Sequence, residues 1–94
     1  MPKTKAKEPK PKKLRLPKDP EGMNGERAEW ADRAIAAFRR ATRSDKEDAV
    51  CDLIADIAHW CDRNDTDLAS EIRRAKLHYS EEAPNGKQFD GLED

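Results

Sequence analysis

Two aspartates and a histidine are the residues whose types and spacing come closest to a chemical site. Asp52, Asp56 and His59 lie four and three residues apart, a spacing that places their side chains on one face of a helix. Carboxylate and imidazole groups bind divalent cations, but a metal site between helices also takes ligands from a second helix. Nothing in the sequence places such ligands opposite these three residues. We therefore expect a solvated acidic face without a metal, and a divalent-metal-binding helical protein is an alternative interpretation.

The two cysteines are expected to remain reduced. Cys51 and Cys61 are ten residues apart in one predicted helix, which corresponds to about 15 Å along the helix axis at 1.5 Å per residue. A disulfide requires Cα atoms within about 7 Å of each other. A structural zinc site usually takes four ligands in closely spaced pairs, and His59 and Cys61 project about 200° apart on a helix.

The common catalytic arrangements are not found in the chain. The serines occupy expected cap or surface positions, so neither a serine–histidine–aspartate triad nor a cysteine–histidine pair is supported. The four glycines do not form a phosphate-binding loop. Paired carboxylates act as acid and base in a dry cleft, which a chain of 94 residues with 35% hydrophobic residues can hardly build. We predict that the protein is not an enzyme and needs no cofactor.

Three helices are predicted to position these side chains, because apolar residues recur with helical spacing over three segments. The segments cover residues 26–42, 45–63 and 67–83. No stretch alternates with the two-residue period of a strand, and the short connections place neighbouring helices antiparallel or steeply crossed. We therefore predict an all-α, three-helix domain with disordered tails.

Polar residues near the start of each segment supply the expected helix caps. Asn24 is the expected cap of the first helix. Ser44 and Glu47 have the spacing of a capping box at the start of the second helix. Asp65 or Thr66 is expected to cap the third helix.

The apolar stripes of the three helices predict a small core. Its large members are Trp30, Ile35, Phe38, Val50, Leu53, Ile54, Ile57, Trp60, Leu68, Ile72 and Tyr79. At about 1.5–3 kcal/mol for each buried side chain, this set leaves a narrow margin over the entropy of ordering the chain. A homodimer would enlarge the core. Leu77 lies well off the stripe of the third helix, which makes it a candidate partner contact.

Charge divides the chain unevenly. Nineteen Lys and Arg residues nearly balance 20 Asp and Glu residues, which argues against a dedicated nucleic-acid coat. Residues 1–25 nevertheless carry eight basic and three acidic residues together with five of the six prolines, a composition typical of disordered or polyproline-like chain. We expect residues 26–83 to form the helical domain and residues 84–94 to form a short acidic C-terminal tail.

The basic N-terminal segment is the candidate contact for nucleic acid. Lys10, Lys12, Lys13 and Arg15 would neutralise phosphates without reading a base sequence. Both tryptophans fall on apolar helix faces, so we expect no aromatic platform for stacking bases in the helical domain.

The sequence argues against a membrane protein. No apolar run approaches the roughly 20 residues that a membrane span needs. The lysines and prolines that follow Met1 are not succeeded by the apolar region of a secretory signal. Together with the reduced cysteines, these features predict a cytoplasmic protein.

One segment resembles a known group of sequences. The run from Asp52 to Arg63 reads DLIADIAHWCDR, and His78 and Tyr79 follow at the end of the next helix. Over roughly residues 27–82 this pattern resembles small uncharacterised helical proteins encoded by bacterial phages, plasmids and other mobile elements. The resemblance implies a bacterial cytoplasmic protein with an accessory role, such as modulating a host or phage protein, and it assigns no catalytic residue.

We interpret the chain as a non-enzymatic accessory protein that acts by binding a macromolecular partner, with a protein as the first choice. One apolar stripe per helix is expected to serve the core, and no site chemistry is left over. The candidate partner contacts are an acidic helix face, a basic cluster and one leucine: Asp48, Asp52, Asp56, His59, Arg39, Arg40, Arg43 and Leu77. A nucleic-acid-associated protein that uses the basic N-terminal segment is the second interpretation.

Overall fold

Three α-helices make up the regular structure of the chain. The computed structural model describes residues 15–92, in which α1 spans Asn24–Thr42, α2 spans Ala49–Arg63 and α3 spans Leu68–Glu82. These residues contain no strand, so the predicted all-α, three-helix fold class is confirmed. None of the three helices in this described part combines the length and the apolar composition that crossing a bilayer requires.

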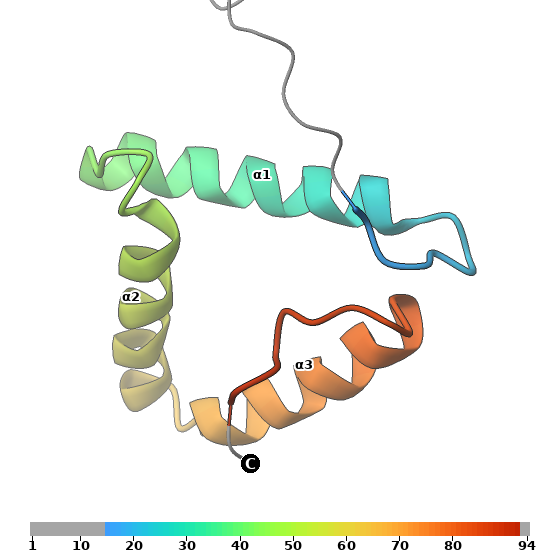
Figure 1. The fold of residues 1–94 in the computed structure, drawn as a ribbon. Coiled ribbons are helices and arrows are strands. Elements are labelled where there is room, and N and C mark those ends of the chain that lie inside the picture. The colour runs from blue at the N-terminus through green and yellow to red at the C-terminus, as the bar shows by residue number, and fades with distance from the viewer. Residues whose placement is uncertain (1–14, 93–94) are drawn as a thin grey trace, which may run out of the picture.

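The helices follow one another around an open frame (Figure 1). α2 turns away from the C-terminal end of α1 at a steep corner, and α3 turns back from the end of α2. The main contacts between helices are those of consecutive helices, α1 with α2 and α2 with α3. The C-terminal end of α3 approaches the start of α1 at the far side of the frame.

The corner between α1 and α2 begins with a residue in the left-handed conformation. Arg43 has a φ of 64° and donates its backbone N–H to the carbonyl oxygen of Arg39 at 2.7 Å, which ends α1. The predicted capping box at Ser44 does not form: the Ser44 hydroxyl accepts from the Thr42 hydroxyl at 3.0 Å and donates to the Asp52 carboxylate at 3.1 Å, and residues 45–48 form a turn. α2 consequently begins at Ala49, several residues later than the sequence predicts.

The starts of α1 and α3 are capped by other residues than predicted. The Asp19 carboxylate accepts the backbone N–H groups of Met23 and Asn24, each at 3.2 Å, and Asn24 is itself the first residue of α1. At α3, the Asp67 carboxylate accepts the backbone N–H of Ser70 at 3.1 Å and the Ser70 hydroxyl at 2.7 Å. A carboxylate in this position satisfies free N–H groups of the first turn and interacts favourably with the helix dipole.

The buried core is smaller than the sequence predicts. Ala49, Cys61 and Ala83 are the buried apolar residues within residues 15–92, and no large side chain there is fully buried. Six predicted core residues are half-buried: Ile35, Phe38, Leu53, Leu68, Ile72 and Tyr79. The other five are exposed: Trp30, Val50, Ile54, Ile57 and Trp60. The prediction of one buried stripe per helix is wrong, because helices that meet at corners cover less of each other's apolar faces than helices packed side by side.

Candidate functional site

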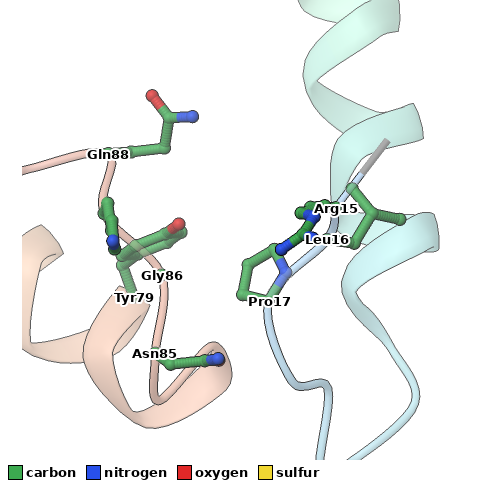
Figure 2. A pocket seen from close by; sticks show the side chains of 8 residues that line it. Arg15, Leu16, Pro17, Tyr79, Asn85, Gly86 and Gln88 are labelled. Carbon is green, nitrogen blue, oxygen red and sulfur yellow. The ribbon is translucent and has the colours of Figure 1, made fainter. Parts of the chain in front are cut away.

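Two adjoining cavities lie where the segment before α1 meets the segment after α3. We call residues 15–17 the strap and residues 85–88 the terminal loop. They face each other across the first cavity, which has a volume of about 620 Å³ (Figure 2). The second cavity has a volume of about 520 Å³ and extends from the strap to the start of α1. The cavities form one open groove, because four residues line both of them: Leu16, Pro17, Tyr79 and Gln88.

Tyr79 is held in the groove by contacts with two residues of the C-terminal segment. Its ring meets the ring of Phe89 edge-on, with centroids 5.5 Å apart and an interplanar angle of 63°. Its phenol end lies so close to Gly86 that a Cβ atom there would collide with Tyr79 Oη. Gly86 is fixed in turn by its backbone N–H, which donates to the carbonyl oxygen of Ala83 at 2.8 Å. A ring held in this way presents its remaining surface to both cavities.

Polar side chains join the start of α1 to the end of α3 beside the groove. We call Glu21, Asn24, Arg27 and Glu82 the closing contact. The side-chain amide of Asn24 donates to the carbonyl oxygen of Glu82 at 2.7 Å. Arg27 donates to Asn24 Oδ1 and to the Glu21 carboxylate, each at 2.7 Å, and its Nε lies 3.5 Å from the Glu82 carboxylate. One arginine therefore connects three segments of the chain.

Arg27 is the one cation of the closing contact, and it pairs with both glutamates. The hydrogen bond from Arg27 to Glu21, with the nearby charge of Glu82, raises the pKa of the guanidinium above its ordinary value. Asp19 and Glu82 are the acidic residues that line the second cavity. Both are already engaged, because Asp19 accepts N–H groups at the start of α1 and Glu82 pairs with Arg27.

The first cavity is cationic. Arg15 and Lys87 line it, and none of the acidic residues between positions 15 and 92 does. The backbone N–H of Lys18 donates to Asn85 Oδ1 at 2.8 Å, which ties the chain after the strap to the terminal loop. The groove therefore has a positively charged end at Arg15 and Lys87 and an acidic end at Asp19 and Glu82.

α2 exposes a contiguous apolar face. Val50, Ile54, Ile57 and Trp60 have 53%, 50%, 40% and 58% of their surface exposed, respectively. Their spacing places them within roughly 120° of the helix circumference, and we call these four residues the apolar face of α2. An apolar patch on one helix face is more informative than single exposed apolar residues, because contiguous patches mark interaction sites.

The acidic residues predicted to bind a partner lie on the opposite side of α2 from its apolar face. Asp48, Asp52, Asp56 and His59 are all exposed. Asp52 accepts the hydroxyl of Ser44, which ties it to the α1–α2 corner. No group of three or more side chains that could hold a metal ion gathers within residues 15–92. The fold therefore places the acidic residues along one helix and does not bring them around a common point.

The other predicted contacts are spread over the molecule. Arg39, Arg40 and Arg43 are exposed at the end of α1, where Arg39 Nε donates to the carbonyl oxygen of Ser44 at 3.2 Å. Leu77 is 67% exposed on the side of α3 that faces away from the stripe of that helix. These surfaces do not form one site.

Of the residues predicted to contact nucleic acid, Arg15 lies in the groove. Lys10, Lys12 and Lys13 fall outside the described residues. Cys51 and Cys61 both lie in α2 and are free, with Cys51 exposed and Cys61 buried. This agrees with the expectation that two cysteines so far apart on one helix do not pair.

Sequence reasoning missed the groove itself. It placed Tyr79 in the core and assigned residues 84–94 to a short acidic tail. The groove joins the strap to the terminal loop, and these segments are nearly 70 residues apart in the sequence. Periodicity and capping describe neighbours along the chain, so they carry no signal for this approach. Comparison with protein-family models, with curated proteins and with solved structures finds no match to this chain.

Proposed function

We propose that this chain is a non-enzymatic accessory protein that acts by binding another protein through the apolar face of α2. The supporting observation is the exposure of Val50, Ile54, Ile57 and Trp60 in a chain whose described residues include no fully buried large side chain. Removing this apolar surface from water is favourable, and a partner that packs against it would do so. The resemblance to helical proteins of bacterial mobile elements and the two free cysteines support an accessory role in the bacterial cytoplasm.

A second copy of the chain suits this face. Val50, Ile54 and Ile57 follow one another at spacings of four and three residues, the pattern with which two helices pack along a seam. In an antiparallel pair, Ile54 of one copy lies opposite the partner's Ile57 at the centre of the seam. The antiparallel helix dipoles then attract, and the acidic residues of both copies point away from the seam.

The expected affinity of such a pair is weak. Completing the burial of Val50, Ile54 and Ile57 contributes about 1 kcal/mol for each side chain, or about 6 kcal/mol for two copies. Trp60 at the edge of the face adds further contact area. Because association has its own entropic cost, the net binding energy is smaller than the summed burial terms, and we expect about 5 kcal/mol, which corresponds to a dissociation constant of hundreds of micromolar. The acidic face of α2 and the arginines at the end of α1 remain open to a further partner.

Light scattering on a gel-filtered sample tests the proposal. We expect the mass to rise from one chain of 10.7 kDa toward two chains as the protein concentration increases through hundreds of micromolar. Ile54→Glu should keep the chain monomeric, because it places a charge in the centre of the seam. Ala55→Glu is the matched control. It adds the same charge at an exposed position on the other side of α2, so it should leave the association unchanged.

Circular dichroism of both variants shows whether they fold. Ile54 is half exposed, so its replacement should leave the helical content as it is. The proposal fails if the folded wild-type chain stays monomeric at the highest concentration. It also fails if Ile54→Glu and Ala55→Glu weaken association equally, because association would then not depend on the apolar face.

A further inference from the structure

We infer that the groove between the strap and the terminal loop binds single-stranded nucleic acid, with a base against Tyr79 and phosphates beside Arg15 and Lys87. This inference does not depend on the proposed pairing through α2, because the groove lies at the opposite side of the frame (Figure 1). It rests on the aromatic ring, the charges and the volume of the groove.

The base site is the surface of Tyr79 that lines both cavities. Phe89 and Gly86 hold the ring in place, so the ring is already oriented before a ligand arrives. Aromatic rings in this state stack on nucleobases of any sequence, because every base has a flat π-face. Pro17 of the strap faces Tyr79 across the cavity (Figure 2), and Leu16 adds apolar surface to the same lining. A flat ring therefore fits between Tyr79 and the strap.

The phosphate site is the cationic end of the groove. Arg15 and Lys87 come from the two walls of the first cavity, one from the strap and one from the terminal loop. The acidic residues of the groove, Asp19 and Glu82, line the second cavity and not the first. An anion at this end thus meets two cations, and none of the described carboxylates lines the same cavity. Arginine and lysine are the side chains that most often contact phosphate groups.

The size of the groove and its remaining polar group agree with this ligand class. The first cavity of about 620 Å³ lies within the range of roughly 300–1,000 Å³ that is usual for ligand sites. Gln88 lines both cavities, and its amide offers a donor and an acceptor to the edge of a base.

The sequence before Arg15 favours a polyanion over a single small anion. Residues 1–14 contain six lysines and one glutamate, so a ligand with many phosphates gains from the whole segment, whereas a lone anion does not. An acidic peptide shares the charge but lacks a regularly repeated flat ring for Tyr79. Single-stranded nucleic acid combines both features.

Fluorescence anisotropy with a labelled ten-nucleotide thymidine strand tests the inference on the full chain at low salt. We expect Tyr79→Leu to weaken binding about tenfold, because stacking on one aromatic ring is lost, whereas Tyr79→Phe keeps the ring and should bind like the wild type. Arg15→Gln and Lys87→Gln should each weaken binding and make the dependence on salt less steep. Lys46→Gln is the matched control, because Lys46 is an exposed cation in the α1–α2 connection, away from the groove.

Circular dichroism confirms that each variant is folded, and the comparison of Lys87→Gln with Lys46→Gln keeps the inference testable if Tyr79→Leu unfolds. The inference is overturned if the wild type does not bind the strand. It is also overturned if Lys46→Gln weakens binding as much as Lys87→Gln, because binding would then depend on the total charge of the protein and not on the groove. A third overturning result is that the triple replacement of Lys10, Lys12 and Lys13 by Gln abolishes binding while folded Tyr79→Leu binds normally. A ten-residue polyglutamate that competes as well as the strand would assign the groove to acidic peptides instead.

Discussion

At the closing contact, α1 and α3 meet through side chains that form hydrogen bonds and ion pairs with each other, whereas along α2 four apolar side chains face solvent. Asn24 and Arg27 reach Glu82 across the frame, and the buried residue nearby is only an alanine, Ala83. Along α2, by contrast, isoleucine and tryptophan side chains remain about half exposed. The frame is thus closed by specific polar contacts and small residues, and the largest apolar side chains of α2 contribute little to its shape.

This difference predicts opposite responses to substitution in the two regions. A change at the closing contact or at Tyr79 should cost stability at any protein concentration, because it disrupts contacts within one chain. A change on the apolar face of α2 should alter association and leave the folded single chain nearly as stable, because little is buried there. Two substitutions test the stability of the groove and of the closing contact, and a third tests the cap of α3.

The largest expected effect is that of Gly86→Ala. The new Cβ would collide with Tyr79 Oη, so the tyrosine ring or the terminal loop must shift. Overpacking of this kind costs about 2 kcal/mol, which corresponds to a fall in Tm of about 10 °C for a domain of this size. Thermal unfolding followed by circular dichroism measures the change.

Gly25→Ala is the control for this substitution. A Cβ at Gly25 meets nothing within 4 Å, and Gly25 lies in the first turn of α1. Alanine in a helix is favoured over glycine by roughly 0.5–1 kcal/mol, so this variant should unfold at a slightly higher temperature. If the two alanine variants unfold at the same temperature, the tight contact between Gly86 and Tyr79 does not stabilise the fold.

A smaller loss is expected for Arg27→Met, which keeps much of the side-chain length and removes the charge. It leaves Asn24, Glu21 and Glu82 without their shared donor, so Tm should fall by a few degrees, and this difference from the wild type should shrink in high salt. Arg33→Met is the matched control, because the Arg33 pair with Glu29 is long, at 3.8 Å, and well exposed. Equal losses in both variants would mean that the closing contact is no more important than an ordinary surface ion pair.

The smallest expected effect depends on pH and concerns Asp67. Hydrogen bonds from the hydroxyl and the backbone N–H of Ser70 hold the pKa of the Asp67 carboxyl below its ordinary value. Its contribution to stability is therefore fully present above the unfolded-state pKa, near 4, and is lost as the pH falls through the lower folded-state pKa. Asp67→Asn removes the titrating group and keeps a cap, so its Tm should decline less than that of the wild type between about pH 5 and pH 2. Parallel declines would show that Asp67 titrates alike in the folded and unfolded chains.

The fold class followed from the sequence because helical periodicity is a local property. Ile72 and Tyr79 recur on one face of α3 in the structure, and both are at least half-buried, as the spacing predicts. The predicted helix starts were less accurate, because several polar residues near each start could serve as the cap. Asp19 and Asp67 form the capping hydrogen bonds, and these bonds depend on the path of the backbone before each helix.

The extent of the core and the position of the groove were not predictable in the same way. The spacing of Ile54 and Ile57 shows which face of α2 is apolar. It does not show whether another helix buries that face. The groove depends on Arg15 and Lys87 approaching from distant parts of the chain, and no local pattern records that approach. The position of each helix is therefore predictable from the sequence alone, whereas the contacts and cavities between distant segments are seen only in the structure.

Both corners of the frame contain a non-glycine residue with positive φ, Arg43 at 64° and Asp65 at 54°. Such a conformation costs roughly 1–2 kcal/mol for a residue with a side chain, and glycine avoids this cost. A glycine at either corner would therefore relieve local strain but would also admit many other bend angles. The angles between α1 and α2 and between α2 and α3 are therefore restricted by two non-glycine residues, which act together with the closing contact to hold α1 and α3 at a fixed separation.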